Sequence, residues 1–363
     1  MKVGIIGAGL SGLSCAHELK RFGIIPTIFE QKNYIGEIFD FQTVSLNNFN
    51  SEFFGNAIKH LKKNYNISLK PQYSLRDLVT IYPNGKVFHT KGKLGYILKR
   101  GKAMDSIENQ IAQAVNLPIQ FHTHINIKSI INDFDRIVVA TGSSSMAKEF
   151  GLFHTTFNAP TRIATISGNF RTDSITLWWN RDYSKNGYAY LVPYSATSAR
   201  LILIVNGIER DEMDDYWNKF LKIEKLNYKI EEIKDVEHNV GFVEPAQYDN
   251  ILFAGVAGGF IDDVFGFAAM KAIMSGVIAA RAIINNENYN DMTESFREDI
   301  KKKHELRTLI NTWDNNAVNK ALAFRNLPII RQYQYNNPLF KITQLTFLAK
   351  IKNYFWRKKH KIL

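Results

Sequence analysis

Three glycines near the start of the chain have the spacing that binds a pyrophosphate. Gly7, Gly9 and Gly12 form the pattern G-x-G-x-x-G directly after an apolar run. In this pattern the first glycine permits a tight turn, the second lets the backbone approach the phosphates, and the third lets a helix lie close to the strand. Ser11 belongs to the start of that helix, whose N-terminus attracts negative charge. These residues therefore predict a dinucleotide-binding site.

The residues on both sides of the glycines predict the elements that must position them. An apolar strand precedes Gly7, a helical segment follows Gly12, and a second strand covers residues 24–29. Glu30 follows this strand, 18 residues beyond Gly12, which is close to the spacing of the acid that accepts hydrogen bonds from the adenosine ribose. A strand–helix–strand unit with chance glycines is the alternative, and the complete order of elements disfavours it.

Two later segments have the pattern of further strands that end in glycine turns. Residues 135–142 predict a buried strand that ends in Ala-Thr-Gly. Residues 250–284 predict another buried strand, which delivers glycines to the N-terminus of a long helix, and such a terminus stabilises the negative charge of a reduced flavin. Each segment alone is a common buried strand. In this order after the first motif, they favour FAD over NAD as the cofactor.

At these segments the chain resembles the geranylgeranyl reductases, FAD-dependent enzymes of the p-hydroxybenzoate hydroxylase fold that saturate double bonds of isoprenoid chains. Residues 255–269 (GVAGGFIDDVFGFAA) align without gaps with the family motif G-D-A-A-G-F-V-[DN]-P-L-T-G-E-G-I. Residues 95–100 (GYILKR) resemble G-Y-[IV]-L-x-R, whose arginine lies near the flavin in that family, and Asp105 follows one residue late. Residues 140–145 resemble A-D-G-x-x-S, and residues 187–193 (GYAYLVP) resemble Y-x-W-x-F-P, which lines the substrate cavity.

The order of these motifs matches the family over residues 1–285, and the resemblance implies a set of cofactor contacts. The implied contacts are Gly7, Gly9, Ser11, Gly12, Glu30, Arg100, Thr141, Gly142, Gly255, Gly258, Gly259, Asp262, Gly266 and Phe267. Several positions depart from the family pattern. Val256 replaces an aspartate, Asp263 replaces a proline, and Phe267-Ala268 replace Glu-Gly where the backbone meets the isoalloxazine. These departures concern the reaction more than the fold.

The family reaction needs an acid, a substrate cavity and a source of electrons. Reduced FAD gives a hydride to one alkene carbon, and an acid protonates the other; Tyr188 and Tyr190 are the two candidates. The aromatic strands around Trp178, Trp179 and these tyrosines either line the cavity or form ordinary sheet core. The chain has no second G-x-G-x-x-G in a strand–helix frame, so we expect NADPH bound transiently, or a carrier protein, as the electron donor.

Together these patterns predict an α/β protein: a Rossmann-type FAD-binding domain, an inserted antiparallel-sheet substrate domain and a helical C-terminal segment. The boundaries predicted are 1–45, 95–150 and 240–288 for the FAD-binding domain, 46–94 and 151–239 for the substrate domain, and 289–363 for the basic helical segment.

Composition narrows the function further. The chain has 363 residues, 45% of them hydrophobic, so it can bury a large core. Cys15 is the single cysteine, which excludes an internal disulfide, and the nine histidines show no metal-ligand spacing, so no metal site is predicted. No apolar run reaches the roughly 18 residues of a membrane-spanning helix. The first strand begins at residue 2 or 3 and leaves no room for a signal peptide, which predicts a cytoplasmic protein.

The positive charge is concentrated at the C-terminus. The net charge is +12, and ten lysines and arginines with no acid occupy the 49 residues after Asp314. Residues 345–363 place aromatic and cationic side chains on two helix faces, a pattern of helices that lie in a membrane surface. An anionic membrane surface, contacted peripherally, is therefore an expected partner, and a helix packed on the core is the alternative. No nucleic-acid partner is expected, because no recognised binding module accompanies the charge.

The leading functional hypothesis is an FAD-dependent oxidoreductase that reduces double bonds of isoprenoid lipids. A flavin monooxygenase or halogenase of the same architecture is the alternative within enzymes. A non-catalytic flavin- or lipid-binding protein is the alternative of another class, and the changes at Val256 and Ala268 motivate it.

Overall fold

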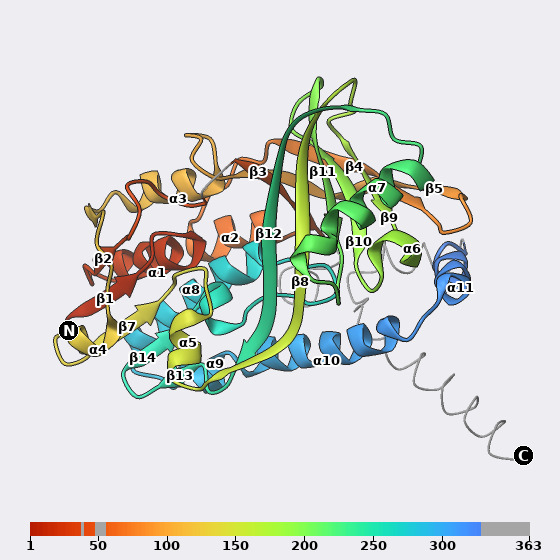
Figure 1. Cartoon of the computed structure of the whole chain (residues 1–363). Coiled ribbons are helices and arrows are strands. Elements are labelled where there is room, and N and C mark those ends of the chain that lie inside the picture. The colour runs from red at the N-terminus through yellow and green to blue at the C-terminus, as the bar shows by residue number, and fades with distance from the viewer. Residues whose placement is uncertain (38–39, 48–55, 328–363) are drawn as a thin grey trace, which may run out of the picture.

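Two β-sheets stand at opposite ends of the molecule, and helices cover both (Figure 1). The structure is a computed structural model that describes residues 1–37, 40–47 and 56–327. Within these residues no helix combines the length and the apolar character needed to cross a membrane.

The smaller sheet has six short, mostly buried strands. Its order is β13 (Gln247–Tyr248), β14 (Ile251–Phe253), β7 (Arg136–Val139), β1 (Val3–Ile6), β2 (Thr27–Phe29) and β6 (Ile119–Gln120). All neighbours are parallel except β13 and β14. Strands that are buried on both faces read as continuous apolar runs, which is why the strands around residues 3–6, 136–139 and 251–253 could be found in the sequence.

The larger sheet has eight strands, several of them long and curled around the helices (Figure 1). Its order is β12 (Lys229–Val243), β8 (Phe153–Ser167), β11 (Ser198–Ile204), β10 (Tyr188–Pro193), β9 (Ser174–Trp178), β4 (Tyr73–Ile81), β5 (Val87–Arg100) and β3 (Phe41–Leu46). The neighbours are antiparallel except β4 and β9, which are parallel. Strands β3 and β5 belong to this sheet, so residues 41–46 and 95–100 reach from it toward the smaller sheet. The domain boundaries stay a prediction.

Three helices cover one face of the smaller sheet. They are α1 (Leu10–Arg21), α8 (Ala269–Asn285) and α3 (Ile107–Val115), and α1 lies against both of the others. The helix predicted to follow the third strand begins only at Ala269, because Gly259 and Gly266 have left-handed φ values of 72° and 68°. A short 3-10 turn, η2 (Gly255–Gly258), and an irregular loop fill the interval.

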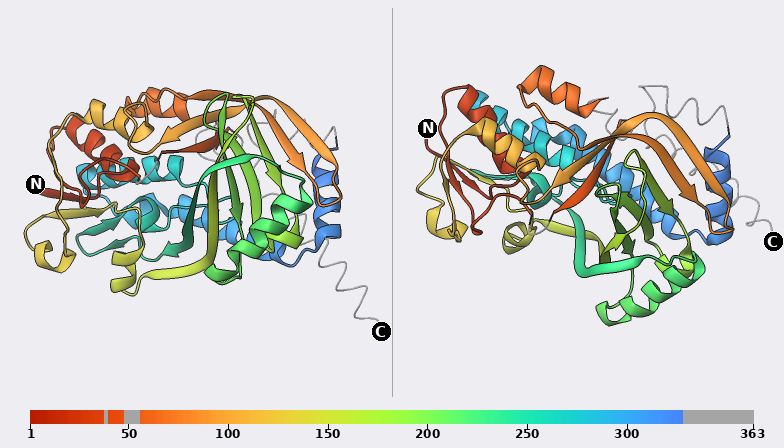
Figure 2. Two further views of the ribbon diagram at one scale, coloured as in Figure 1. Left: turned by 45° about the horizontal axis from the view of Figure 1, so that its top comes forward. Right: turned by 90° about the horizontal axis from the view of Figure 1, so that it is seen from above.

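Different elements cover the two faces of the larger sheet. On the outer face, α7 (Met213–Ile223) packs Trp217 and Phe220 against the strands, next to η1 (Arg210–Glu212) and α6 (Arg181–Ser184). On the inner face lie the loop before α8, α10 (Glu294–Asn311) and α11 (Asn315–Arg325). The tip of the β4–β5 hairpin reaches α11 (Figure 2). The remaining helices are α2 (Ala57–Tyr65), α4 (Ile127–Ile130), α5 (Ser145–Glu149) and α9 (Tyr289–Met292).

The contact between α1 and α8 depends on Gly276 of α8, and the contact between α1 and the turn before it depends on Gly12. A Cβ atom on Gly276 would overlap the carbonyl oxygen of Ser11, and one on Gly12 would overlap that of Gly7. The hydroxyl of Ser14 donates across the contact to the carbonyl of Ile273 at 2.9 Å. Since the clashing atoms are backbone, they cannot move aside as a flexible side chain would.

Replacing Gly276 with alanine should therefore destabilise the protein. Helix propensity alone would stabilise the variant by about 1 kcal/mol, whereas forcing two packed helices apart costs about 1–3 kcal/mol. We expect a net loss in the free energy of unfolding, measured by urea denaturation. A gain in stability would contradict the close packing of the two helices.

Candidate cofactor site

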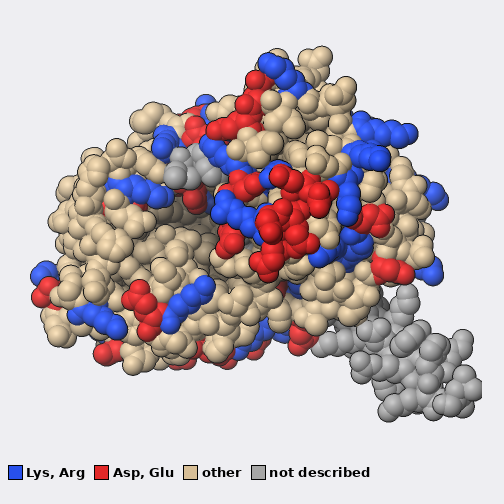
Figure 3. Space-filling view, viewed as in Figure 1, with Lys and Arg blue, Asp and Glu red and all other residues tan. Residues whose placement is uncertain are grey.

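The carboxyl ends of β1, β7 and β14 bring three distant glycine segments into contact. A Cβ atom on Gly7, whose φ is 107°, would overlap the carbonyl oxygen of Ala140, and one on Gly255 would lie 2.5 Å from the hydroxyl oxygen of Ser11. The first segment therefore touches the second at Gly7 and the third at Ser11. Ligands of parallel α/β sheets bind at this edge of the sheet, and the surface is hollowed between the two sheets on the face seen in Figure 3.

Open space lies in front of the first helix. Gly9 is the N-cap of α1 and gives it no side-chain cap, and the first intrahelical bond runs from the Leu13 amide to the Gly9 carbonyl. The atom nearest to a Cβ on Gly9 would be 4.0 Å away, and a Cβ on Gly142 would have no neighbour within 4 Å. An uncapped helix N-terminus with free space before it suits a phosphate. The residues present thus fit a pyrophosphate.

Glu30 is held at the same edge by two backbone amides. One carboxylate oxygen accepts a hydrogen bond from the Ala8 amide and the other from the Lys32 amide, both at 2.9 Å. The side chain is buried. A carboxylate has about four acceptor positions, so about two remain for ribose hydroxyls, as the spacing from Gly12 predicts.

Arg100 is bound by two acids. Its guanidinium donates to Glu108 at 2.8 Å and to Glu37 at 2.9 Å, and it lies over the ring of Phe41. Burial raises the pKa of Glu108, and the charge of Arg100 opposes that rise. These contacts tie the end of β5 to α3 and the segment after β2, and the predicted role of Arg100 beside a flavin stays a prediction.

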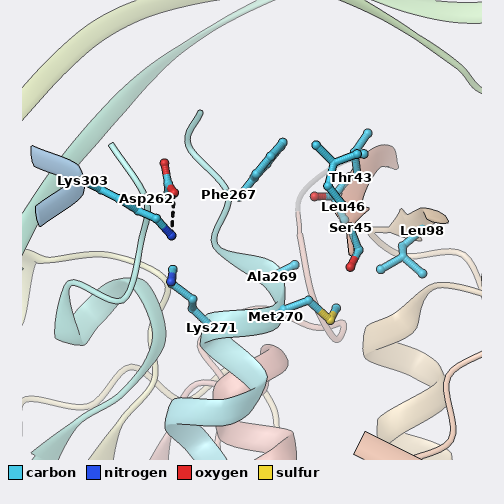
Figure 4. A pocket seen from close by; sticks show the side chains of 11 residues that line it. Thr43, Ser45, Leu46, Leu98, Asp262, Phe267, Ala269, Met270, Lys271 and Lys303 are labelled. Atoms are coloured by element: carbon cyan, nitrogen blue, oxygen red, sulfur yellow. Dashed lines mark ion pairs between the residues drawn. The ribbon is translucent and has the colours of Figure 1, made fainter. Parts of the chain in front are cut away.

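A small cavity of about 20 Å³ lies between β3 and the N-terminus of α8 (Figure 4). Thr43, Ser45 and Leu46 line it from β3, and Phe267 projects into the space between β3 and the loop before α8. The ring of Phe267 stacks on that of Phe265, with centroids 5.6 Å apart. Of the predicted cofactor contacts, Asp262 and Phe267 lie at this cavity, and Gly266 stands directly before Phe267.

The other two glycines of the third segment serve packing. A Cβ on Gly258 would overlap the carbonyl of Phe253, and one on Gly259 would lie 2.6 Å from the Cα of Phe242 in β12. Val256 stands half-buried in the 3-10 turn after β14. The basic segment 345–363 lies outside the described residues.

Four buried charges lie beside the cavity, and we call them the inner charge network: Asp262, Lys271, Asp299 and Lys303. The sequence predicted Asp262 as a cofactor contact, whereas the other three were missed. One oxygen of Asp299 accepts from Lys271 at 2.8 Å and from Lys303 at 2.9 Å, and Lys303 lies 3.4 Å from Asp262. The second oxygen of Asp262 accepts from the amides of Val264 and Phe265. The i,i+4 spacing of Asp299 and Lys303 in α10 was the only local signal in the sequence, because Lys271 belongs to α8 and Asp262 to the loop before it.

Asp263, which replaces the family proline, also has a partner in α10. Its carboxylate lies 2.7 Å from the Nδ1 of His304, and Arg307 donates to the carbonyls of Val264 and Asn186. Burial raises the pKa of Asp263, and the hydrogen bond from His304 opposes that rise. Helix α10 therefore fixes the loop before α8 through Lys303, His304 and Arg307, and it fixes the start of α8 through Asp299.

The two candidate proton donors differ in their surroundings. The hydroxyl of Tyr188 donates to the carbonyl of Phe265 at 2.6 Å, so its proton is engaged in holding the loop. Tyr190 is half-buried and lies on the same face of the sheet as Tyr188. In the described part of the chain its hydroxyl has no hydrogen-bond partner. Burial raises the pKa of Tyr190 to about 12. Among contacts with the described residues, Tyr190 is therefore the one of the two with a free hydroxyl.

The predicted aromatic lining splits between the two faces of the sheet. Trp179 stacks on Tyr188 with centroids 5.3 Å apart, on the inner face with Phe265. Trp178 points to the outer face and packs on Phe220 of α7. Adjacent residues of a strand face opposite sides, so Trp178 belongs to the core under α7.

Comparisons with known proteins agree with this architecture. Residues 5–64 match the model of an NAD(P)-binding Rossmann-like domain. Among curated proteins, conditioned medium factor receptor 1 of Dictyostelium discoideum is 24% identical over 256 residues, which are 67% of this chain. The match spans 49% of that receptor, so the chain corresponds to about half of its length.

Solved structures resemble the whole chain. A geranylgeranyl bacteriochlorophyll reductase-like protein from Thermoplasma acidophilum superposes with a TM-score of 0.71 at 14% identity, over 96% of this chain and 98% of that one. The flavin-dependent brominase Bmp2 superposes with a TM-score of 0.68 at 14% identity, over 98% of this chain and 100% of that one. A flavoprotein/dehydrogenase from Cytophaga hutchinsonii superposes with a TM-score of 0.63 at 14% identity, over 97% of this chain and 100% of that one. The fold predicted from the sequence is confirmed.

Proposed function

Because the chain has the fold of the FAD-dependent oxidoreductases, we propose that it binds FAD and reduces double bonds of an isoprenoid lipid. The convergence of the three glycine segments at one edge of the smaller sheet is the observation that carries this proposal. In the proposed complex, the α1 N-terminus and Gly9 bind the pyrophosphate, Glu30 binds the ribose, and the segment 262–271 contacts the flavin ring. FAD, once bound and reduced, supplies the reducing equivalents.

The inner face of the larger sheet is the proposed place for the apolar substrate. The aromatic side chains on this face are those of Trp179, Tyr188 and Tyr190, with Phe265 from the loop before α8. Helices α10 and α11 shield them from water. An alkene is a poor electrophile, so its reduction benefits from a site that excludes water. NADPH bound transiently, or a carrier protein, is the proposed electron donor.

The absorbance spectrum of the purified protein tests the cofactor. Bound FAD gives absorbance bands between 350 and 500 nm. We expect these bands in the purified protein, either as isolated or after incubation with FAD. A colourless protein after incubation would instead support a binding protein without flavin chemistry. For the reaction, mass spectrometry should find a lipid product heavier by two hydrogens after incubation with dithionite-reduced enzyme.

The second candidate is a flavin monooxygenase or halogenase, and the likeness to the brominase Bmp2 supports it. It predicts rapid, substrate-stimulated NADPH oxidation that consumes oxygen and yields peroxide or an oxygenated or halogenated product. The reductase predicts product under anaerobic conditions. Reaction in the absence of oxygen therefore separates the two.

Substituting the two tyrosines should separate their roles. Tyr190→Phe should lower kcat by about 100-fold or more, since a positioned acid contributes about 10²–10⁴-fold. Tyr188→Phe removes the hydrogen bond to the Phe265 carbonyl and should cost about 1 kcal/mol of stability with a smaller loss in kcat. Because the pKa of Tyr190 is raised to about 12, the wild-type rate should show no loss from this group at neutral pH. Equal losses in kcat would contradict the assignment.

The basic segment 345–363 is proposed to bring the protein to an anionic membrane surface from the cytoplasm. Aromatic side chains would enter the headgroup region while the lysines and arginines face the lipid phosphates. The full chain should sediment with vesicles that contain anionic lipid, and a chain ending at Pro338 should not. Equal sedimentation of the two, or binding to neutral vesicles alone, would contradict the proposal.

A further inference from the structure

A second cavity, of about 390 Å³, opens between α6 and the beginning of α11. Arg181, Asp182, Lys185 and Asn186 line it on the side of α6, and residues 313–316 line it on the side of α11. Both helices lie at the end of the molecule that is opposite to the smaller sheet (Figure 1). None of the predicted cofactor contacts lines this cavity, which we call the α6–α11 pocket.

Arg181 lies at this pocket and uses only part of its hydrogen-bonding capacity. Its Nη1 donates to the carbonyl of Lys185 at 2.7 Å and its Nη2 to the carbonyl of Ile310 at 2.6 Å, while its Nε is buried without an acceptor. A guanidinium has five N–H groups, so three of them remain after these two bonds among the described residues. A buried donor without an acceptor costs free energy, and a bound acceptor would recover it.

The charge of Arg181 also has no carboxylate partner in the described part of the chain. Burial and, in second place, the positive charge of Arg307 lower the pKa of Arg181 to about 10. Arg307 is 2% exposed and donates to two backbone carbonyls. Two buried guanidinium groups of the same sign therefore lie close enough to repel each other, and a bound anion would stabilise both.

The other charges that line the pocket are engaged elsewhere. Asp182 accepts a hydrogen bond from the side-chain amide of Asn315 at 3.0 Å, and Asp314 is the N-cap of α11. The ammonium group of Lys185 donates to a backbone carbonyl at 2.8 Å. The two acids and the two bases balance formally, so the pocket should select a ligand by the position of the free donors of Arg181 and not by net charge.

Two asparagines add donors from both sides of the pocket. Asn186 and Asn316 line it, and neither side chain has a hydrogen-bond partner among the described residues. The oxygens of a carboxylate lie in one plane, whereas those of a phosphate point in several directions and also bind an arginine in pairs. The half-buried Trp313 provides an apolar wall beside these donors, and the volume leaves room for more than the phosphate group itself.

From this geometry we infer that the α6–α11 pocket binds a phosphate monoester, with Arg181 as the residue that holds the phosphate oxygens. The phosphate belongs either to a small soluble ester or to the head group of a lipid, and the two share this chemistry. The inference does not depend on bound FAD, because the pocket and the proposed cofactor site have no residue in common.

The Asn316→Asp variant tests the inference by placing a negative charge in the pocket. Asn316 is exposed in the first turn of α11, where an acid is favourable, so the variant should melt no lower than the wild type. Calorimetric titration of the full chain with glycerol 3-phosphate, in the presence of excess FAD, should give an affinity at least about tenfold weaker than that of the wild type, because like charges repel.

Asn218→Asp is the matched control, since it makes the same change at an exposed position of α7 that does not line the pocket. Its affinity should stay within about twofold of the wild type, as expected for an exposed charge. Arg181→Lys keeps the charge but loses the planar fork and should weaken binding about tenfold or more. If Arg181→Lys fails to fold because two carbonyls lose their donor, Asn316→Asp still decides.

Geranyl monophosphate is the second probe and identifies the source of the phosphate. Equal affinity for both probes indicates a soluble ester, and clearly tighter binding of geranyl monophosphate indicates a lipid head group. Either result supports the pocket when Asn316→Asp weakens the binding and Asn218→Asp does not. A wild-type protein that binds neither probe overturns the inference. Binding that Asn316→Asp leaves unchanged also overturns it, since another site would then hold the phosphate.

Discussion

Replacing Gly9 with valine should abolish FAD binding while the protein stays folded. The backbone of Gly9 has φ −92° and ψ −168°, which any residue adopts, and the nearest atom to a Cβ there is 4.0 Å away. A valine therefore fits the fold, but its methyl groups occupy the space before the α1 N-terminus in which a pyrophosphate must lie. We expect the affinity for FAD to fall by at least about 100-fold, which is about 2.7 kcal/mol.

The measurement is a titration with FAD followed by flavin absorbance and fluorescence, with thermal unfolding of the apoprotein beside it. The melting temperature of the apoprotein should stay near that of the wild type. Gly12→Ala is the contrasting variant, since its Cβ would overlap the Gly7 carbonyl and so should lower the melting temperature of the apoprotein. If Gly9→Val kept the wild-type affinity for FAD, the first glycine segment would not be part of the site.

Removing the carboxylate of Asp299 should produce the largest loss of stability. Asp299→Ala leaves the ammonium groups of Lys271 and Lys303 side by side, buried and without their shared acceptor. Breaking a buried ion pair by removal of one partner costs about 3–5 kcal/mol. The loss should appear as a lower denaturation midpoint in urea, together with easier proteolysis of the loop before α8.

Two variants check that the loss comes from removing the carboxylate that the two lysines share. Glu298→Gln, at the neighbouring exposed position, should change stability by about 0.5 kcal/mol or less. Adding Lys271→Met to Asp299→Ala should recover part of the loss, because one of the two cations that lost Asp299 is then absent. An Asp299→Ala protein as stable as Glu298→Gln would mean that the network contributes little to holding α10 against the loop.

The glycine segments were predictable because a glycine requirement is local. Gly7 is needed for a positive φ, Gly12 for the close approach of its own helix to the preceding turn, and both constraints act within a few residues. The parallel strands were predictable for a similar reason, since burial on both faces leaves a continuous apolar run. These signals determined the class of fold and the edge of the sheet at which a dinucleotide would bind.

The charges around the cavity were not predictable in the same way. Lys271 and Asp299 lie 28 positions apart, and Asp263 and His304 lie 41 apart. Nothing in the local pattern pairs them, since the spacing of charges along a helix says which face they share and not which element packs on it. The tyrosines were likewise equivalent in sequence, and only the approach of the Phe265 carbonyl distinguishes Tyr188 from Tyr190.

The sequence alone thus determined the dinucleotide fold and the glycines of the proposed pyrophosphate end, because steric limits on the backbone are set by neighbouring residues. The tertiary structure decided the surroundings of the proposed flavin end. There α8, α10 and the larger sheet converge, and the burial of Lys271, Asp299 and Lys303 together makes their charges strong. Electrostatic strength depends on distance and on exclusion of water, and both are properties of packing between elements that are distant in the chain.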